Sequence, residues 1–378
     1  MPGPEGGGLV NWQCWTFRFL DTCFFRDGLP YHAGEGGYTM VRTIFPPFIT
    51  TLQGAIRTCL AEERGWRPGQ KNGWPAELGG PDDPGDLQFR GPYLWTAEGP
   101  LFPMPLHLLV KKMQDVSYAF TRLIPGDPVK CDLGEVRLTV PDPPLAGAGL
   151  PENLFLLPSG LQTVLQGGLP ETSEVQDSAK LWATEYRTGL ERDDNTRTAW
   201  KGMLYNCAHV RPDRGLGLVV LVCGIPKEWP VAPRRVLNLG GEGRMAEVKV
   251  DLLAAEQALL PPPGIPAPHT DGRLYFTATL ITPGWYEDLE RVIREGPPGI
   301  PGKCVSACLG KVVQVGGWDL ANQEPRPLVQ LLPAGSTWFF AADVAEVDDL
   351  ANLHGQCIGA GTAYGFGQIL IGKWREEI

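Results

Sequence analysis

Residues 359–374 read GAGTAYGFGQILIGKW, with glycine at positions 359, 361, 365 and 367 directly before an apolar run that is typical of a buried strand. The dinucleotide fingerprint of a Rossmann fold also has closely spaced glycines, but it needs a strand before them and a helix after them. Here the strand, residues 368–374, follows the glycines. The stretch therefore argues against a dinucleotide site and indicates a glycine loop that leads into the last strand of a domain.

A second glycine loop, residues 240–244 (GGEGR), stands directly before another alternating strand, residues 246–252. In each half of the chain the elements predicted before the glycine loop follow the same order: strand, helix, strand, strand, helix. In the first half they are residues 12–20, a helix from about 50 to Gly65, a hairpin of residues 202–210 and 216–223, and a helix at 226–237. In the second half they are residues 274–281, 285–295, 305–315, 336–342 and 344–353.

This order is that of a ferredoxin-like domain, and it occurs twice. We therefore predict an α+β protein of two ferredoxin-like (RRM-like) β-α-β-β-α-β domains. The first spans residues 1–258 and carries a large loop-rich insertion at about 66–200, and the second spans residues 267–378. Between them lies a proline-rich hinge, residues 261–266 (PPPGIP).

The composition describes a globular chain rich in loops. Of 378 residues, 48 are Gly and 37 are Pro, while 43% are hydrophobic and can form a core. No apolar run approaches the length of a membrane span, and the first Lys or Arg is Arg18, so we expect no membrane contact, no signal peptide and a cytoplasmic location. The nine cysteines are then expected to be free thiols.

The chain carries little that suggests a metal, a cofactor or catalysis. Cys304 and Cys308, with His354 and Cys357, lack the tight spacing of a zinc site, and buried core thiols are the favoured interpretation. None of the five histidines lies in a hydrolase or metalloprotease motif. His32, in a glycine-rich loop, is the one placed like a general base for RNA cleavage. We expect no cofactor, no metal and no enzyme activity, with a nuclease as the alternative.

The charge is unevenly distributed. The net charge is −10, yet residues 187–244 contain ten Lys or Arg against six Asp or Glu. A local basic patch on an acidic body fits a subunit that binds a polyanion on one face. By charge alone, an ordinary solvated surface is an equally good interpretation of this stretch. Likewise, Tyr364 and Phe366 between glycines could stack on unpaired bases, or they could be core aromatics of a tight turn.

Several motifs, in order along the whole chain, resemble one known family. They are FFRDG at 24–28 with Pro30, FPP at 45–47, TLQGAIR at 51–57, YRTGLERDDNTRTA at 186–199, GMLY at 202–205, LGGEGR at 239–244, GGWD at 316–319, PAGS at 333–336 and the last glycine loop. Together they resemble the third Cmr subunit of type III-B CRISPR effector complexes, a RAMP-superfamily protein. One departure is Gly243, where many relatives have a second arginine.

The resemblance implies a non-catalytic subunit that binds the crRNA and holds its 5′ repeat-derived tag. It implies that the subunit bridges the large polymerase-type Cmr subunit to the backbone Cmr subunits, and that it meets the target RNA indirectly. A metal-independent crRNA-processing endoribonuclease of the RAMP fold and a protein-only scaffold are the alternatives.

A single-stranded tag is recognised by arginines and backbone N–H groups on phosphates and by aromatic rings on splayed bases. The first candidates for phosphate contacts are Arg187, Arg192, Arg197 and Arg244. The second candidates are Arg26, Arg42 and Arg57. The remaining candidates for RNA contact are His32, Gly240, Gly241, Gly359, Gly361, Tyr364, Gly365, Phe366 and Gly367.

Overall fold

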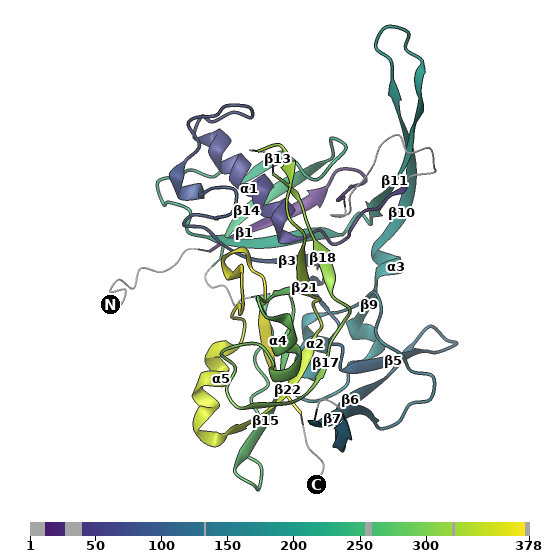
Figure 1. The fold of residues 1–378 in the computed structure, drawn as a ribbon, viewed down its shortest axis with the longest axis vertical. Helices are drawn as coiled ribbons and strands as arrows, with labels where there is room; N and C mark the ends of the chain where they lie inside the picture. Colours follow the sequence, from purple (N-terminus) through teal and green to yellow (C-terminus); the bar gives the residue numbers. More distant parts are fainter. Residues whose placement is uncertain (1–11, 27–39, 132–133, 254–258, 320–321, 375–378) are drawn as a thin grey trace.

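The computed structural model describes residues 12–26, 40–131, 134–253, 259–319 and 322–374. The chain is mostly strands with few helices, which confirms a mixed α and β protein. Figure 1 shows one group of elements around α1 in the upper part and another around α4 and α5 in the lower part. No helix within the described ranges is both long and apolar enough to cross a membrane.

The upper part is built on an eight-stranded sheet of order β13-β14-β1-β12-β3-β4-β8-β9, whose neighbours are antiparallel. In that order the strands are Arg234–Asn238, Met245–Leu253, Trp12–Phe19, Gly217–Cys223, Gln88–Thr96, Gly99–Pro103, Leu154–Leu156 and Val175–Asp177. The helices of the first 200 residues are α1 (Ile49–Glu63), α2 (Pro158–Leu165) and α3 (Ser178–Leu181).

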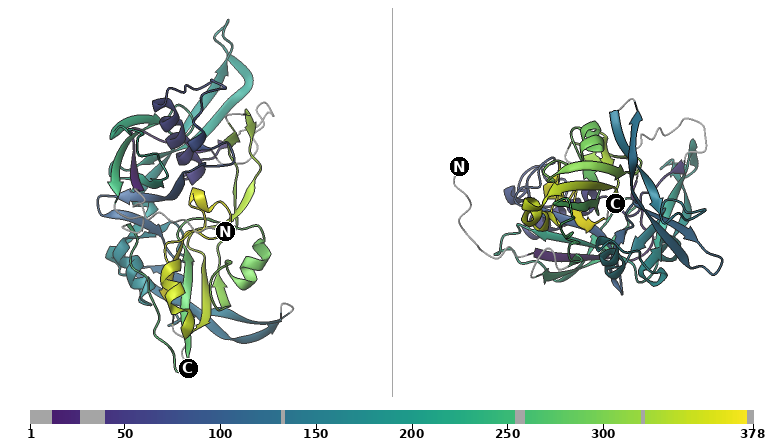
Figure 2. Two further views of the ribbon diagram at one scale, coloured as in Figure 1. Left: turned by 90° about the vertical axis from the view of Figure 1, so that its left-hand side faces the viewer. Right: turned by 90° about the horizontal axis from the view of Figure 1, so that it is seen from below.

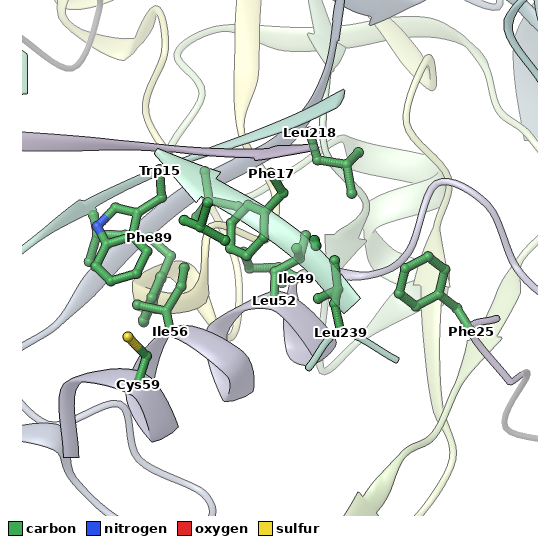
Figure 3. Packing of buried hydrophobic residues seen from close by; sticks show 14 of the residues in the cluster. Trp15, Phe17, Phe25, Ile49, Leu52, Ile56, Cys59, Phe89, Leu218 and Leu239 are labelled. Carbon is green, nitrogen blue, oxygen red and sulfur yellow. The ribbon is translucent and has the colours of Figure 1, made fainter. Parts of the chain in front are cut away.

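Helix α1 packs on one face of this sheet, as the period of its apolar residues predicts. Trp15 and Phe17 of β1 are fully buried and face Leu52 and Ile56 of the helix (Figure 3). Full burial of one such side chain stabilises the fold by roughly 1.5–3 kcal/mol. The helix ends as expected before Gly65, whose φ of +90° lies in the region that glycine adopts most easily.

Two predictions for the upper part are wrong, although both predicted strands, 202–210 and 216–223, are present. Residues 202–210 and 216–223 do not pair with each other: β12 pairs with β1 and β3, and all seven of its residues are buried. A strand buried on both faces belongs in the middle of a sheet, and this requirement prevails over the short turn. Residues 226–237 do not form a helix, because Pro230 and Pro233 interrupt the segment, and β13 pairs with β14 instead.

The range 66–200 contributes four strands to the main sheet, β3, β4, β8 and β9. Strand β3 lies within this range and pairs antiparallel with β12, so the sheet contains the order β14-β1-β12-β3. The same range also forms a separate three-stranded sheet of β5 (Leu108–Lys112), β6 (Tyr118–Cys131) and β7 (Gly134–Asp142).

A long two-stranded ribbon projects from the upper part (Figures 1 and 2). It consists of β10 (Trp182–Arg192) and β11 (Ala199–Pro212), which pair antiparallel, and β2 (Met40–Val41) pairs with β11 near its middle. The base of the ribbon lies beside the end of β1, because Cys23 forms a backbone bridge with Val210.

The lower part contains a four-stranded antiparallel sheet of order β17-β22-β15-β23. Along the chain its elements are β15 (Arg273–Leu280), α4 (Leu289–Glu295), β17 (Lys303–Cys308), β22 (Thr337–Asp343), α5 (Val347–Leu353) and β23 (Ile369–Lys373). The expected strand at 305–315 is divided into β17 and a separate strand, β18 (Val313–Val315). The short strands are β16 (Gly284–Trp285), β19 (Trp318–Asp319), β20 (Glu324–Pro325) and β21 (Val329–Leu332).

The two parts share buried residues. Val315 of β18, Leu331 of β21 and Phe366 belong to the same hydrophobic core as Trp15 of β1. A buried hydrogen bond also joins the parts, since the hydroxyl of Tyr93 in β3 donates to the side-chain oxygen of Gln368. The first core is therefore completed by residues from the end of the chain.

Candidate nucleic-acid interface

Three arginines converge on one carboxylate beside the end of β1. The Asp21 oxygens lie 3.4 Å from Arg187 Nη2, 3.2 Å from Arg211 Nη1 and 2.9 Å from Arg244 Nη1. Glu185 adds a second acid, 2.8 Å from Arg187 and 2.6 Å from Arg211. We call these five residues the Asp21 cluster. Its side chains are 21–49% exposed, so the cluster is reachable from solvent and has three positive charges against two negative ones.

The cluster is assembled by strand register. In the β10–β11 pair, Glu185 lies opposite His209, Arg187 opposite Cys207 and Arg211 opposite Ala183, so all six residues share one face of the ribbon. Asp21 lies two residues after the end of β1, and Arg244 directly precedes β14. Because β1 and β14 are neighbours, Asp21 and Arg244 meet where one strand ends and the other begins.

Beneath the cluster lies a floor formed by Phe24 and His209, whose rings are stacked with centroids 5.2 Å apart. His209 is buried and its Nδ1 lies 3.3 Å from the hydroxyl of Thr22. Burial, and then the charges of Arg244 and Arg187, lower the pKa of His209. His209 is therefore neutral at pH 7 and adds no positive charge to the arginines above it.

The glycine loop 240–244 packs on this floor. The N–H of Gly241 donates to the carbonyl of Phe24 at 2.9 Å, and Gly240 has a φ of +79°. A Cβ on Gly240 would lie 2.4 Å from the Phe24 carbonyl oxygen, so only glycine allows this close approach. Gly240 and Gly241 thus support Arg244 through the backbone, and the structure places all three near Arg187.

Arg192 and Arg197 lie elsewhere, at the far end of the projecting ribbon (Figure 1). Both side chains are exposed. Asp193 orders the turn between them by accepting hydrogen bonds from the N–H groups of Asn195 and Thr196 at 2.9 and 2.8 Å. Arg197 has a φ of +55° in this turn. The ribbon therefore carries basic residues both at its base and at its end.

Arg26 and Arg42 are both exposed. Their backbones lie close together in space, because Arg26 forms a backbone bridge with Thr43, the neighbour of Arg42. The hydroxyl of Thr43 fixes this segment by accepting from the N–H of Phe25 at 2.9 Å. Both arginines remain candidates for phosphate contact. His32 lies outside the described residues.

The candidate Arg57 is a structural residue, which corrects the prediction. It is 6% exposed and donates to the carbonyls of Leu78 at 2.8 Å and Asp83 at 3.0 Å, as well as to the carbonyl of Gly80. Burial lowers the pKa of its guanidinium. Its donors hold the loop that follows α1, so they do not face a ligand.

The second glycine loop is also packed inside the protein, so the prediction of a base-stacking surface is wrong for Phe366. Phe366 is 3% exposed and packs edge-on against Trp285. Tyr364 is half-buried and stacks on Phe89 of β3. A ring with both faces covered cannot receive a base, and the alternative of a tight turn with core aromatics describes Phe366 correctly.

The loop's glycines serve close packing. A Cβ on Gly359 would lie 2.4 Å from the carbonyl oxygen of Trp285, and one on Gly361 would lie 2.8 Å from the Trp285 ring. Gly365 is similarly close to Phe89 and Gly367 to Ile358. Tight backbone contact with protein, rather than an open anion-binding ledge, therefore explains Gly359, Gly361, Gly365 and Gly367.

Within the described ranges, no group of three or more His, Cys, Asp or Glu residues is arranged to hold a metal ion. His354 is buried, its Nε2 donates to the carbonyl of Pro261 at 2.8 Å and its Nδ1 accepts from the N–H of Ile371 at 3.1 Å. Both ring nitrogens are thus used by backbone groups. Cys308 is buried among Tyr275, Phe339 and Trp374, the environment of a core thiol.

Sequence reasoning missed Asp21, Glu185 and Arg211 as site residues. The pattern of Glu185 and Arg187 two positions apart places both on one face of a strand, and this was the available signal. Arg211 joins them only through the pairing of β10 with β11, which cannot be deduced without the register. Tyr186 is 66% exposed and points to the opposite face of the ribbon from Arg187.

A family model described as CRISPR-associated protein (Cas_Cmr3) matches residues 15–374, and the chain therefore belongs to this family. The match confirms the resemblance to the third Cmr subunit of type III-B CRISPR complexes. The family description names no catalytic activity. No curated protein was found whose sequence matches the chain significantly.

The solved structures to which this chain is similar include chains of CRISPR complexes. One is a chain of a cryo-EM structure of the Type III-B Cmr-beta bound to cognate target RNA, with 13% identity, a TM-score of 0.47, and coverage of 90% of this chain and 89% of that chain. Another is a chain of a crystal structure of the Csm3-Csm4 subcomplex in the type III-A CRISPR-Cas interference complex, with 9% identity, a TM-score of 0.37, and coverage of 96% and 100%.

Proposed function

We propose that this chain is a non-catalytic crRNA-binding subunit of a type III-B CRISPR ribonucleoprotein, and that the Asp21 cluster contacts the backbone of the 5′ repeat-derived tag. The observation that carries the proposal is the convergence of Arg187, Arg211 and Arg244 on one solvent-reachable face. Arginine donors in a fixed arrangement suit phosphate oxygens. The net charge of −10 leaves this face as a local basic feature on an acidic body.

We assign further RNA contacts to residues beside the Asp21 cluster and to both faces of the ribbon. Arg26 and Arg42 would contact phosphates near the first loop, while Arg192 and Arg197 would contact RNA at the end of the ribbon. Tyr186, exposed on the ribbon, is the aromatic side chain best placed to stack on an unpaired base. Gly240 and Gly241 would act by holding Arg244 in position.

We also propose that the protein consists of two ferredoxin-like units, residues 1–258 and 267–378, with an insertion in the first. Each unit has the strand order fourth-first-third-second: β14-β1-β12-β3 and β23-β15-β22-β17. In the first unit, the β13 strand takes the place of the second helix. The family to which the chain belongs supports this description of both units as RAMP domains.

We further propose that the subunit bridges the large polymerase-type Cmr subunit to the backbone subunits and meets target RNA through them. Two ribbons project from the molecule, β10–β11 from the upper part and β6–β7 from the lower part (Figures 1 and 2). The second exposes apolar side chains, with Leu138 62% exposed and Val129 and Val140 beside it. Exposed apolar groups gathered on one element are typical of surfaces that partners cover.

RNA binding can be tested with the full chain and a labelled single-stranded RNA that carries the tag, titrated at several salt concentrations. Arg187→Ala and Arg244→Ala should each weaken binding and lower the slope of log Kd against log salt by about 1. Arg294→Ala is the matched control, because Arg294 is also an exposed arginine paired with an acid, Glu290, but lies on α4 in the lower part. The control should bind like the wild type.

Two outcomes would replace the proposal. If the cluster variants bind RNA as the wild type does, the chain is a protein-only scaffold. If the purified chain cleaves a precursor crRNA in the presence of a chelator, and His32→Ala abolishes the cleavage, it is a processing endoribonuclease. Bridging is tested separately: Leu138→Asp with Val140→Asp should reduce co-purification with the other Cmr subunits and leave RNA binding by the isolated chain unchanged.

A further inference from the structure

Asp21 occupies an unusual place for an acid on a surface that binds RNA. Its carboxylate contacts all three arginines of the cluster, whereas Glu185 contacts only two of them. A carboxylate and a phosphodiester present the same kind of anionic oxygen to a guanidinium. We propose that Asp21 competes with RNA phosphates for Arg187, Arg211 and Arg244 and so lowers the affinity of this surface for RNA. The inference rests on the proposed function and adds a residue that limits binding.

A role in fold stability does not account for this arrangement. Asp21 is 47% exposed and its arginine partners are 21–49% exposed. Ion pairs between exposed side chains contribute little to stability, because water and salt screen them. The charge of Asp21 also repels a phosphate that comes within a few ångströms, and a repulsion that is small for folding still changes an RNA affinity several-fold. Asp21 therefore matters more for an arriving phosphate than for the fold.

Groups other than Asp21 also hold the three arginines in position. Glu185 also pairs with Arg187 and Arg211, and the backbone of the glycine loop positions Arg244 through the hydrogen bond between Gly241 and Phe24. The N–H of Thr22 donates to the Asp21 side chain, whose pKa is lowered by this hydrogen bond and by Arg211 and Arg187. Asp21 is thus ionised at neutral pH, and an asparagine could still accept the Thr22 hydrogen bond. The charge can be removed without dismantling the cluster.

The decisive experiment compares Asp21→Asn with the wild-type chain on two labelled RNAs of equal length, one with the tag and one scrambled. Because phosphates carry no sequence information, both RNAs should bind more tightly by the same factor, about 5- to 10-fold at low salt. The salt slope should become steeper by about 1. Asp21→Glu, which keeps the charge, should bind like the wild type.

Glu242→Gln is the matched control, because Glu242 is an exposed acid in the same loop as Arg244 but takes no part in the ion pairs of the Asp21 cluster. It should change RNA affinity by less than 2-fold. An equal gain for Glu242→Gln would show a general charge effect and overturn the proposal. Weaker or unchanged binding by Asp21→Asn, with Asp21→Ala giving the same result in a folded protein, would also overturn it.

The arginine variants show separately whether the proposed function itself is wrong. In that case Arg187→Ala and Arg244→Ala would leave RNA affinity unchanged, whatever Asp21→Asn does. If those arginine variants weaken binding and Asp21→Asn weakens it as well, RNA binding stands, and Asp21 is a residue that only positions the arginines.

Discussion

The ring of Tyr364 lies parallel to the ring of Phe89, with the two planes 9° apart and the centroids separated by 6.5 Å. Tyr364 belongs to the glycine loop before the last strand, and Phe89 belongs to β3 of the first sheet. This loop therefore forms a buried contact between the two parts of the molecule, and its glycines allow the loop backbone to approach the backbone of β3.

Gly365→Ala should lower the free energy of unfolding by about 2–4 kcal/mol, because the new Cβ combines an unfavourable backbone conformation with a clash. Gly365 has a φ of +86° and its Cβ would lie 2.8 Å from the carbonyl oxygen of Phe89. Gly299→Ala is the control, since Gly299 has a φ of +80° and no atom within 4 Å of its Cβ. Urea unfolding should show a smaller loss for the control, of about 1 kcal/mol; equal losses would mean that the close approach is unimportant.

Arg57→Met should lower the free energy of unfolding by about 3 kcal/mol, because carbonyls in the 78–83 loop lose their buried donor. RNA affinity should not change beyond the effect of unfolding. Arg67→Met is the comparison, because Arg67 also donates to carbonyls, those of Glu62 and Trp66, but on the exposed surface. It should shift stability by less than about 0.5 kcal/mol. A stable Arg57→Met protein with weak RNA binding would return Arg57 to the interface.

His107 makes stability depend on pH. It is buried, and burial, followed by the charge of Arg122, lowers its pKa from 6.5 to about 4. In the unfolded chain the ring binds a proton near its ordinary pKa, so this contribution to stability is complete above about pH 6.5 and falls as the pH decreases toward 4. Between pH 7 and pH 5 the loss is on the order of 2 kcal/mol.

Urea unfolding of the wild type and His107→Gln at both pH values measures this contribution of His107 to the free energy of unfolding. The variant should be less stable at pH 7, because the Thr337 contact at 3.3 Å is altered, and should lose less stability on acidification. Parallel pH profiles for the two proteins would show that another group causes the dependence.

Thiol reactivity should separate one cysteine from the rest. Burial raises the pKa of Cys23 and Cys304 to about 12 and that of Cys59 and Cys308 to about 11, so these thiols remain protonated at pH 8. Cys131 is exposed at the end of β6. A disulfide reagent should label Cys131 within minutes in the native protein, and Cys23, Cys59, Cys304 and Cys308 only after unfolding. Cys131→Ser should remove the fast phase, and fast labelling that persists would contradict the assignment.

Local periodicity predicted the elements that have one buried face. The alternation in β1 and the stripe of α1 identify both elements, because each pattern records burial along a single segment. The partners of β12 could not be predicted in this way. Its neighbour β3 is separated from it by more than a hundred residues of chain, and no local signal specifies that pairing.

The candidate site could likewise be predicted only in part, because local patterns do not show which distant segments come together. Arg187 and Arg57 are both arginines in regular elements, yet one is half-buried beside Asp21 and the other is enclosed by the 78–83 loop. The difference arises from where a distant segment folds back, which the residue type does not reveal. For Phe366 the sequence predicted exposure where the structure shows burial. A glycine-rich context suggests an open loop, but here the glycines are needed for close packing on Trp285 and Phe89.

Phe366 packs in the same core as Trp15, and this has a consequence for synthesis of the protein. A ribosome makes Trp15 long before Phe366, so the nascent first sheet emerges with an unfilled apolar surface. That surface stays uncovered until Phe366 has left the exit tunnel. During this interval the nascent chain is a natural client for chaperones that shield apolar side chains.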